Sequence, residues 1–272
     1  MNSTFITWMK NYLIIGYGWL GKALSLALKE DGANVYSTST DENKLNEMLS
    51  DGIYPVRLMK IDQIVSWEET PSKFFDAVII TFPPFAGVLE SLQNLVSSIK
   101  ADLVIFTSST GVYLDESRVM DESAPVSTSH LVFHMEECIR ALVTGKYIIL
   151  RLAGHVGPNR HPVRFFLRHK RDISNGQAPV NLIHQSDIIA AIMCILAEPK
   201  QDEIYNVCWP EHPTKEEYYG KIAGQLTDEK LVFLEGNHGK KIEGSKINRH
   251  TRFVYTYSIH GINDLDLKKD NI

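Results

Sequence analysis

The chain of 272 residues is predicted to form an α/β fold, in which a doubly wound parallel sheet is followed by a smaller C-terminal subdomain. Two observations predict this class. Short apolar runs of strand length alternate with segments whose apolar residues recur at helical spacing, and the first run leads through glycines directly into a helix. Strands joined by helical crossovers pair in parallel and carry helices on both faces of the sheet.

The first elements follow from local patterns. Residues 12–15 are a continuous apolar run of strand length that ends at Gly16. From Trp19 onward apolar residues recur at helical spacing, and Gly32 is a stop signal for this helix. A second strand begins at Val35, so the chain opens with a β-α-β unit.

The alternation then continues to the end of the chain. We expect strands at residues 54–58, 77–81, 103–107, 147–152, 180–184 and 204–208, and helices at residues 42–49, 88–99, 131–142, 187–196 and 215–226. Glycine, proline and basic residues crowd together after residue 152, which indicates a change of organisation. We therefore expect one domain at residues 1–157 and a smaller region at residues 158–272, from which residues 180–197 return to the sheet.

Composition excludes some classes of partner. The formal net charge of −5 gives no electrostatic reason to expect a nucleic acid. No apolar run approaches the roughly 20 residues that cross a bilayer, and the N-terminus lacks a secretion signal, so we expect a cytoplasmic protein without a membrane partner. The three cysteines form no CxxC pair and are expected to be buried thiols.

A glycine-rich loop is the most informative motif. Gly16, Gly18 and Gly21 form a GxGxxG pattern between the first strand and the first helix. Gly16 would allow a tight turn, Gly18 a close approach of the backbone to a pyrophosphate, and Gly21 close packing of helix on sheet. The amides of Trp19 and Leu20, beside Tyr17 in the same loop, would face the anion. The sequence therefore predicts a Rossmann domain that binds a dinucleotide.

The end of the second strand bears on which dinucleotide binds. An acidic residue there would bind the adenosine ribose, but the strand ends in Ser39 and Thr40, and Asp41 comes late. Small hydroxyls and Lys44 would accommodate a 2′-phosphate, which favours NADP over NAD. In the alternative interpretation, Thr40 or Asp41 only caps the helix that begins near Glu42.

Five motifs, taken in order, resemble a known superfamily. They are GYGWLG, VIFTSSTGVY, ILRLAGHVGPNRHP, VNLIHQSDIIAAI and IYNVCWP. The chain resembles the short-chain dehydrogenase/reductase superfamily, in particular its extended and atypical members of NAD-dependent epimerase/dehydratase type, and most closely the YeeZ-like bacterial proteins. The matching pieces span residues 11–210 approximately.

The resemblance implies roles for several residues. Ser109, four residues before Tyr113, matches the hydroxyl that binds the reacting oxygen of the substrate. Phe82 and Pro83 match a turn along the cofactor ribose. The substrate side of the cleft is implied for residues 159–164, together with His184 and Asp187. Tyr113 is a candidate proton donor, although in the superfamily this tyrosine usually packs at a strand end.

One departure from the superfamily pattern concerns the chemistry. Catalytic members begin the helix after the fifth strand with Tyr-x-x-x-Lys, which residues 125–137 lack. In one register Ser129 and Phe133 occupy the two positions. In the next register His130 and His134 do, and histidine is a competent acid or base near neutral pH. The alternative is that both histidines are ordinary helix residues, and we expect no metal site from them.

Two classes of function follow from these observations. The first is an NAD(P)-dependent oxidoreductase or epimerase/dehydratase-like enzyme that acts on a small or sugar-like molecule, with Ser109 orienting the substrate. The second is a non-catalytic NAD(P)-binding sensor or regulatory protein, because the Tyr-x-x-x-Lys pair is absent. The sequence leaves the oligomeric state open and is compatible with a homodimer.

Overall fold

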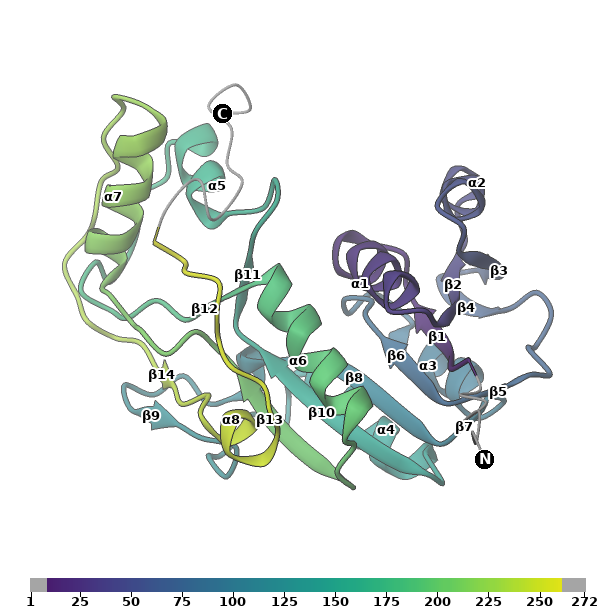
Figure 1. Ribbon diagram of the computed structural model, residues 1–272. Coiled ribbons are helices and arrows are strands. Elements are labelled where there is room, and N and C mark those ends of the chain that lie inside the picture. Colours follow the sequence, from purple (N-terminus) through teal and green to yellow (C-terminus); the bar gives the residue numbers. More distant parts are fainter. Residues whose placement is uncertain (1–8, 261–272) are drawn as a thin grey trace, which may run out of the picture. The chain divides into compact units, whose positions relative to one another are not determined.

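The computed structural model describes residues 9–260 and confirms the predicted α/β class. An eight-stranded sheet has the order β13-β10-β8-β6-β1-β2-β3-β4 (Figure 1). Its strands are β1 (Asn11–Ile15), β2 (Asn34–Ser39), β3 (Tyr54–Ile61), β4 (Ile64–Trp67), β6 (Ala77–Ile80), β8 (Leu103–Ser109), β10 (Lys146–Leu152) and β13 (Glu203–Val207). The apolar run predicted as the first strand is β1, which pairs in parallel with β2 and β6.

The helices of the described chain are α1 (Trp19–Glu30), α2 (Glu42–Ser50), α3 (Val88–Val96), α4 (Leu131–Leu142), α5 (Pro162–His169), α6 (Gln185–Ala197), α7 (Lys215–Leu226) and α8 (Lys246–His250). Six of these helices lie close to predicted positions, and α5 and α8 were not predicted. Leu20, Leu24 and Leu28 form the buried stripe of α1, as their spacing predicts. In Figure 1, α1 lies above β1 and β6, and α3 lies on the other side of these strands.

Several elements differ from the sequence-based expectations. The helix expected to reach residue 99 ends at Val96, and the hydroxyls of Ser97 and Ser98 bond carbonyls of its last turn. The antiparallel hairpin of β3 and β4 was not predicted. Its turn uses positive φ at Asp62 and Gln63, without the glycine that usually marks such a turn. The stretch predicted only as basic contains α5, which starts at Pro162.

Shorter strands pair outside the large sheet. β11 (Gly154–Val156) pairs with β12 (Leu182–His184), so the strand expected near residues 180–184 lies in a two-stranded sheet of its own. β9 (Val119–Met120) pairs with β14 (Lys241–Ile242), and β5 (Phe74–Phe75) pairs with β7 (Lys100–Ala101).

The chain divides into two compact units that are each built from separate segments. Unit 1 comprises residues 1–107, 129–149 and 199–203, and unit 2 comprises residues 108–128, 150–198 and 204–272, of which the structure describes residues 9–260. These units describe contacts within the chain. The domain division predicted at residue 157 remains a prediction.

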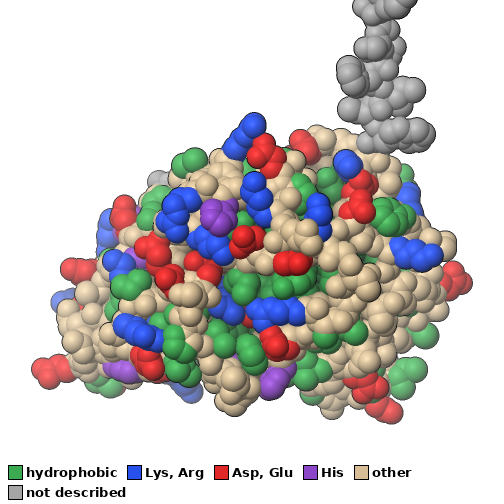
Figure 2. Space-filling model, turned by 90° about the horizontal axis from the view of Figure 1, so that it is seen from below, with side chains coloured by type: hydrophobic (Ala, Val, Ile, Leu, Met, Phe, Trp, Pro, Cys, Tyr) green, Lys and Arg blue, Asp and Glu red, His purple; other side chains and the backbone are tan. Residues whose placement is uncertain are grey.

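Charge is mixed on the face drawn in Figure 2, where Lys and Arg side chains alternate with Asp and Glu side chains. Among the described residues, no helix has the length and hydropathy needed to cross a membrane.

Candidate functional site

The glycine loop lies in unit 1, where β1 ends and α1 begins. Gly16 has a φ of +113°, a conformation that favours glycine. Its amide donates to Thr38 Oγ1 at 3.0 Å, and its carbonyl accepts from Thr81 Oγ1 at 2.8 Å. Threonines at the ends of β2 and β6 therefore hold both polar groups of this turn.

Gly21 and Gly18 have different steric surroundings. A Cβ on Gly21 would lie 1.9 Å from the carbonyl oxygen of Gly16, so only glycine allows α1 to pack this closely on the loop. A Cβ on Gly18 would meet no atom within 4 Å. The close-packing role expected of Gly21 is therefore present in the structure. The pyrophosphate contact at Gly18 remains a prediction.

Tyr17 anchors the loop to α2. Its side chain is buried, and its hydroxyl donates to Asp51 Oδ2 at 2.7 Å, at the C-terminal end of α2. Burial raises the pKa of Tyr17, and the bond to Asp51 raises it further. The same bond lowers the pKa of Asp51, and Lys22 lowers it further. This contact ties the glycine loop to the end of α2 through the side chain of Tyr17.

A cavity of about 240 Å³ adjoins the loop at the carboxyl ends of β1, β2 and β6, where open α/β sheets bind ligands. It brings together seven of the predicted cofactor residues: Gly16, Tyr17, Gly18, Ser39, Thr40, Phe82 and Pro83. The other three, Trp19, Leu20 and Gly21, do not line it. Leu58 and Val65 of the unpredicted hairpin form an apolar wall, together with Phe85 and Leu95.

The polar end of this cavity contains Ser39, Thr40 and Lys44, and no carboxylate lines the cavity. Asp41 lies beside it as the N-cap of α2, where its Oδ1 accepts from the Asn43 amide at 2.8 Å. This confirms the helix-capping interpretation for Asp41. Ser39 supports the same turn, since its Oγ accepts from the Asp41 amide at 3.0 Å.

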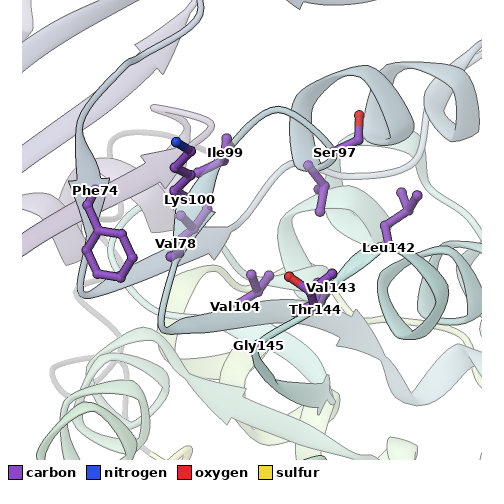
Figure 3. Close-up of a pocket in the computed structure, with 12 residues that line it drawn as sticks. Phe74, Val78, Ser97, Ile99, Lys100, Val104, Leu142, Val143, Thr144 and Gly145 are labelled. Carbon is purple, nitrogen blue, oxygen red and sulfur yellow. The ribbon is translucent and has the colours of Figure 1, made fainter.

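A second cavity in unit 1, of about 320 Å³, lies near the amino ends of β6 and β8. Figure 3 shows Phe74 and Lys100 on one side of it and Leu142 and Thr144 on the other. None of the predicted site residues lines this cavity, although it is the larger of the two. Chemistry and position in the sheet therefore favour the cavity at the glycine loop.

Two of the predicted catalytic residues lie in unit 2, around one turn of 3-10 helix, η1 (Thr110–Val112). Ser109 Oγ accepts from the Gly111 amide at 3.0 Å. Tyr113 is 2% exposed, and its hydroxyl donates to Asn206 Oδ1 at 2.7 Å and accepts from Arg151 Nη1 at 3.1 Å. Burial raises the pKa of Tyr113, and the charge of Arg151 opposes that rise. Both candidates have hydrogen-bond partners within unit 2, and their catalytic roles remain predictions.

The other two candidates, His130 and His134, lie in unit 1. His130 is the N-cap of α4, and its Nδ1 accepts from the Val132 amide at 3.2 Å. His134 is exposed in the first turn of the helix. The predicted pair therefore consists of a capping residue and a helical residue. The α4 sequence, LVFHMEECIRAL, contains neither tyrosine nor lysine.

Residues that the resemblance places near a substrate have structural partners within unit 2. His184 is the N-cap of α6, and its ring stacks on Tyr257 with 5.0 Å between centroids. Asp187 is fully buried and accepts from the amides of Thr256 and Tyr257, the shortest bond being 3.1 Å. Burial raises its pKa. Sequence reasoning missed this anchor, because no local pattern links residues that lie 69 positions apart.

Among the described residues, no group of three or more His, Cys, Asp or Glu side chains is placed to hold a metal ion.

Comparisons with known proteins place this architecture in a class. UDP-glucuronic acid 4-epimerase from Bacillus cereus, in complex with NAD, has a TM-score of 0.71 at 16% identity, covering 96% of each chain. A short-chain dehydrogenase/reductase superfamily protein from Agrobacterium tumefaciens, with bound NAD, has a TM-score of 0.69 at 15% identity, covering 96% of each chain. The chain therefore shares the Rossmann-like α/β fold of these two structures.

Sequence similarity to a known protein assigns the chain to a family. The Escherichia coli (strain K12) protein YeeZ is 34% identical over 267 residues, which cover 92% of this chain and 97% of YeeZ. The chain belongs to the YeeZ family, as its motifs predict. No family model matches it.

Proposed function

We propose that the cavity at the glycine loop binds NAD or NADP. The observation that carries this proposal is the convergence of Gly16, Gly18, the end of β2 and the turn after β6 on one cavity within unit 1. The proposal is further supported by structures of the same fold that contain NAD. The apolar wall from the β3–β4 hairpin would accept the adenine ring, and the first turn of α1 would receive the pyrophosphate.

Gly18→Ala tests the binding step. The φ of −94° at Gly18 suits alanine, and the added Cβ meets no protein atom, so the variant should fold as the parent does. Because the methyl group would occupy space needed by the pyrophosphate, the affinity for NADH and NADPH should fall by at least about tenfold. Fluorescence titration measures this affinity.

Gly224→Ala is the matched control. Gly224 lies in α7, where a Cβ also meets nothing within 4 Å, and its replacement should leave binding unchanged. If neither NADH nor NADPH binds the parent protein, the proposal fails.

Within this proposal NADP is the preferred cofactor. Lys44 lines the cavity and no carboxylate of the described residues does, an arrangement that suits a 2′-phosphate. Lys44→Met should weaken NADPH binding by about five- to tenfold and leave NADH binding nearly unchanged. An equal effect on both cofactors, or tighter binding of NADH by the parent protein, would contradict the preference.

The activity proposed for the loaded protein is that of an oxidoreductase or an epimerase/dehydratase-like enzyme acting on a small or sugar-like substrate. Ser109 would orient the substrate, because it ends β8 at the position where its resemblance to the superfamily implies this role. Turnover of NADPH across carbonyl and sugar-nucleotide substrates tests the activity. Ser109→Ala should reduce that turnover and preserve cofactor binding.

The absence of tyrosine and lysine from α4 favours a second candidate function, a sensor that binds NAD(P) without turnover. The engagement of the Tyr113 hydroxyl by Asn206 and Arg151 supports it as well, since this phenol already has two partners. Cofactor binding with no turnover on any substrate of the panel would favour the sensor over the enzyme.

A further inference from the structure

Three polar side chains form a hydrogen-bonded chain on two loops of unit 2. Ser117 Oγ lies 3.1 Å from His238 Nδ1, and His238 Nε2 lies 3.2 Å from Asp115 Oδ2. The amide of Gly239 donates to Ser117 Oγ at 3.2 Å. A hydroxyl, an imidazole and a carboxylate in this order are the parts of an activated nucleophile.

The scaffold beneath these side chains is regular. The loop that carries Asp115 and Ser117 continues into β9, and the loop that carries His238 continues into β14, its parallel partner. The Lys241 amide donates to the carbonyl of Arg118 at 3.0 Å, directly after the cluster. Lys240 Nζ donates to the Tyr113 carbonyl at 2.9 Å and ties the two loops a second time. The register of a strand pair therefore holds the serine and the histidine together.

The two contacts of His238 fit the tautomer that carries its proton on Nε2. A proton on Nε2 is donated to the Asp115 carboxylate, which leaves the lone pair of Nδ1 free to accept the Ser117 hydroxyl proton. Asp115 would thus be a positioning residue for the imidazole. The His238 and Asp115 side chains are 52% and 78% exposed, so an ester can reach the cluster from solvent.

We propose that Ser117 and His238 form an acyl-transfer site that hydrolyses small activated carboxylic esters. Ser117 Oγ forms a bond to the ester carbonyl carbon while its proton passes to His238 Nδ1. The tetrahedral adduct breaks its bond to the alkoxide, which leaves with that proton and gives an acylated Ser117. Water then attacks the acyl carbon and yields its proton to His238, and the carboxylic acid departs as the proton returns to Ser117.

A fluorophosphonate probe on the full chain tests the nucleophile, with the labelled residue located by peptide mass spectrometry. Ser117 Oγ should attack the phosphorus of the probe and displace fluoride, while its proton passes to His238, so that Ser117 becomes labelled. His238→Gln should slow this labelling by about 100-fold, the usual contribution of a general base. Ser123 is the internal control, because it is exposed and its hydroxyl bonds to Asp121 without a histidine. It should remain unlabelled.

The role of Asp115 requires a readout of the imidazole itself. Nitrogen-15 NMR of His238 should report a proton on Nε2 in the parent protein and a mixture of tautomers in Asp115→Ala. Hydrolysis of 4-nitrophenyl acetate should pass through a single acetyl group per chain on Ser117, which water then removes, and both the acetyl group and the hydrolysis should be lost in Ser117→Ala.

Equal labelling of Ser117 and Ser123, or labelling of Ser117 that is unaffected by His238→Gln, would overturn the proposal. If His238 has the same tautomer in Asp115→Ala as in the parent protein, Asp115 has no positioning role in the proposed site. None of these results depends on the proposed NAD(P) function.

Discussion

His161 is a buried histidine that the fold holds in its neutral form. Its side chain caps α5, with Nδ1 accepting from the Val163 amide at 3.1 Å. Its Nε2 lies 2.9 Å from the hydroxyl of Tyr218, which donates onward to the Ile259 carbonyl at 2.8 Å. Burial, followed by the charge of Arg164, lowers the pKa of His161 to about 3.

This histidine predicts a pH dependence of stability. Between its unfolded pKa of about 6.5 and its folded pKa of about 3, the unfolded chain binds a proton that the native chain does not. The free energy of unfolding should therefore fall as the pH drops through this window, by up to about 1.4 kcal/mol per pH unit from this group. Urea denaturation at several pH values measures the slope.

His161→Asn is the variant that isolates this effect, because asparagine can still cap a helix but does not titrate. Its stability should depend less steeply on pH than that of the parent. His155, whose pKa burial and Arg160 lower to about 4, should contribute a similar slope that remains in the variant. An unchanged slope in His161→Asn would rule out the assignment.

At the scale of single residues, the sequence predicts the roles that depend on neighbouring residues in the chain. The roles of Gly16 and Gly21 could be predicted, because a turn and a close approach depend on neighbouring residues. The surroundings of Tyr113 and His161 could not be predicted. Their hydroxyl and ring partners lie 93 and 57 positions away, and no spacing rule links residues so distant.

Among the elements, the β3–β4 hairpin joins the fold to the candidate site. The Val65 amide on β4 donates to Ser91 Oγ of α3 at 2.8 Å, and Ser91 donates to the Gly87 carbonyl at 2.8 Å. Trp67 Nε1 donates to Ser98 Oγ at 2.9 Å. These bonds hold the hairpin on α3 and thus hold the apolar wall of the cavity.

Ser91→Ala should loosen this wall. The change leaves the Val65 amide without its acceptor in a buried place, which should cost about 1–2 kcal/mol of unfolding free energy. Since Val65 and Leu58 line the cavity, NADPH affinity should fall as well. Chemical denaturation and fluorescence titration measure the two effects.

Ser97→Ala is the matched control for this prediction. Ser97 is an exposed serine at the end of the same helix, and its hydroxyl bonds only the Gln93 carbonyl. Its stability should stay within about 0.5 kcal/mol of the parent. Equal losses in the two variants would show that the hairpin contact has no special role.

Elements with strong periodicity were the ones that the sequence predicted well. The helices α4 and α7 have the predicted bounds, and β1, β6 and β8 occupy apolar runs. The strand β3 was predicted in part, but β4 and the hairpin were missed, because the turn at Asp62 and Gln63 contains no glycine to mark it. The helix α5 was missed because its basic residues dominate the sequence pattern and its buried apolar stripe consists of only Val163 and Leu167.

On the scale of the whole molecule, the chain passes between the two units several times. In unit 2, Asn206 lies among groups from distant segments. Its backbone amide donates to Glu122 Oε1 at 2.8 Å. Its side chain accepts from the Tyr113 hydroxyl and donates to the carbonyl of Met120. Residues before position 158 therefore complete the surroundings of this buried side chain.

A fragment of residues 158–272 should consequently fail to fold alone. It lacks Tyr113, Met120 and Glu122, so Asn206 would lose three of its buried or half-buried hydrogen bonds. Circular dichroism and amide proton NMR should report an unfolded chain. A dispersed spectrum would instead support residue 157 as an autonomous domain boundary.

Each of the two outermost strands of the large sheet has an amide that is bound by a side chain. At β4 the Val65 backbone amide donates to Ser91 Oγ. At β13 the Asn206 backbone amide donates to Glu122 Oε1, and the Cys208 amide just beyond the strand donates to the Tyr255 hydroxyl at 3.2 Å. A strand from another chain would have to break these bonds in order to pair with the same amides, which disfavours edge-to-edge association at these positions.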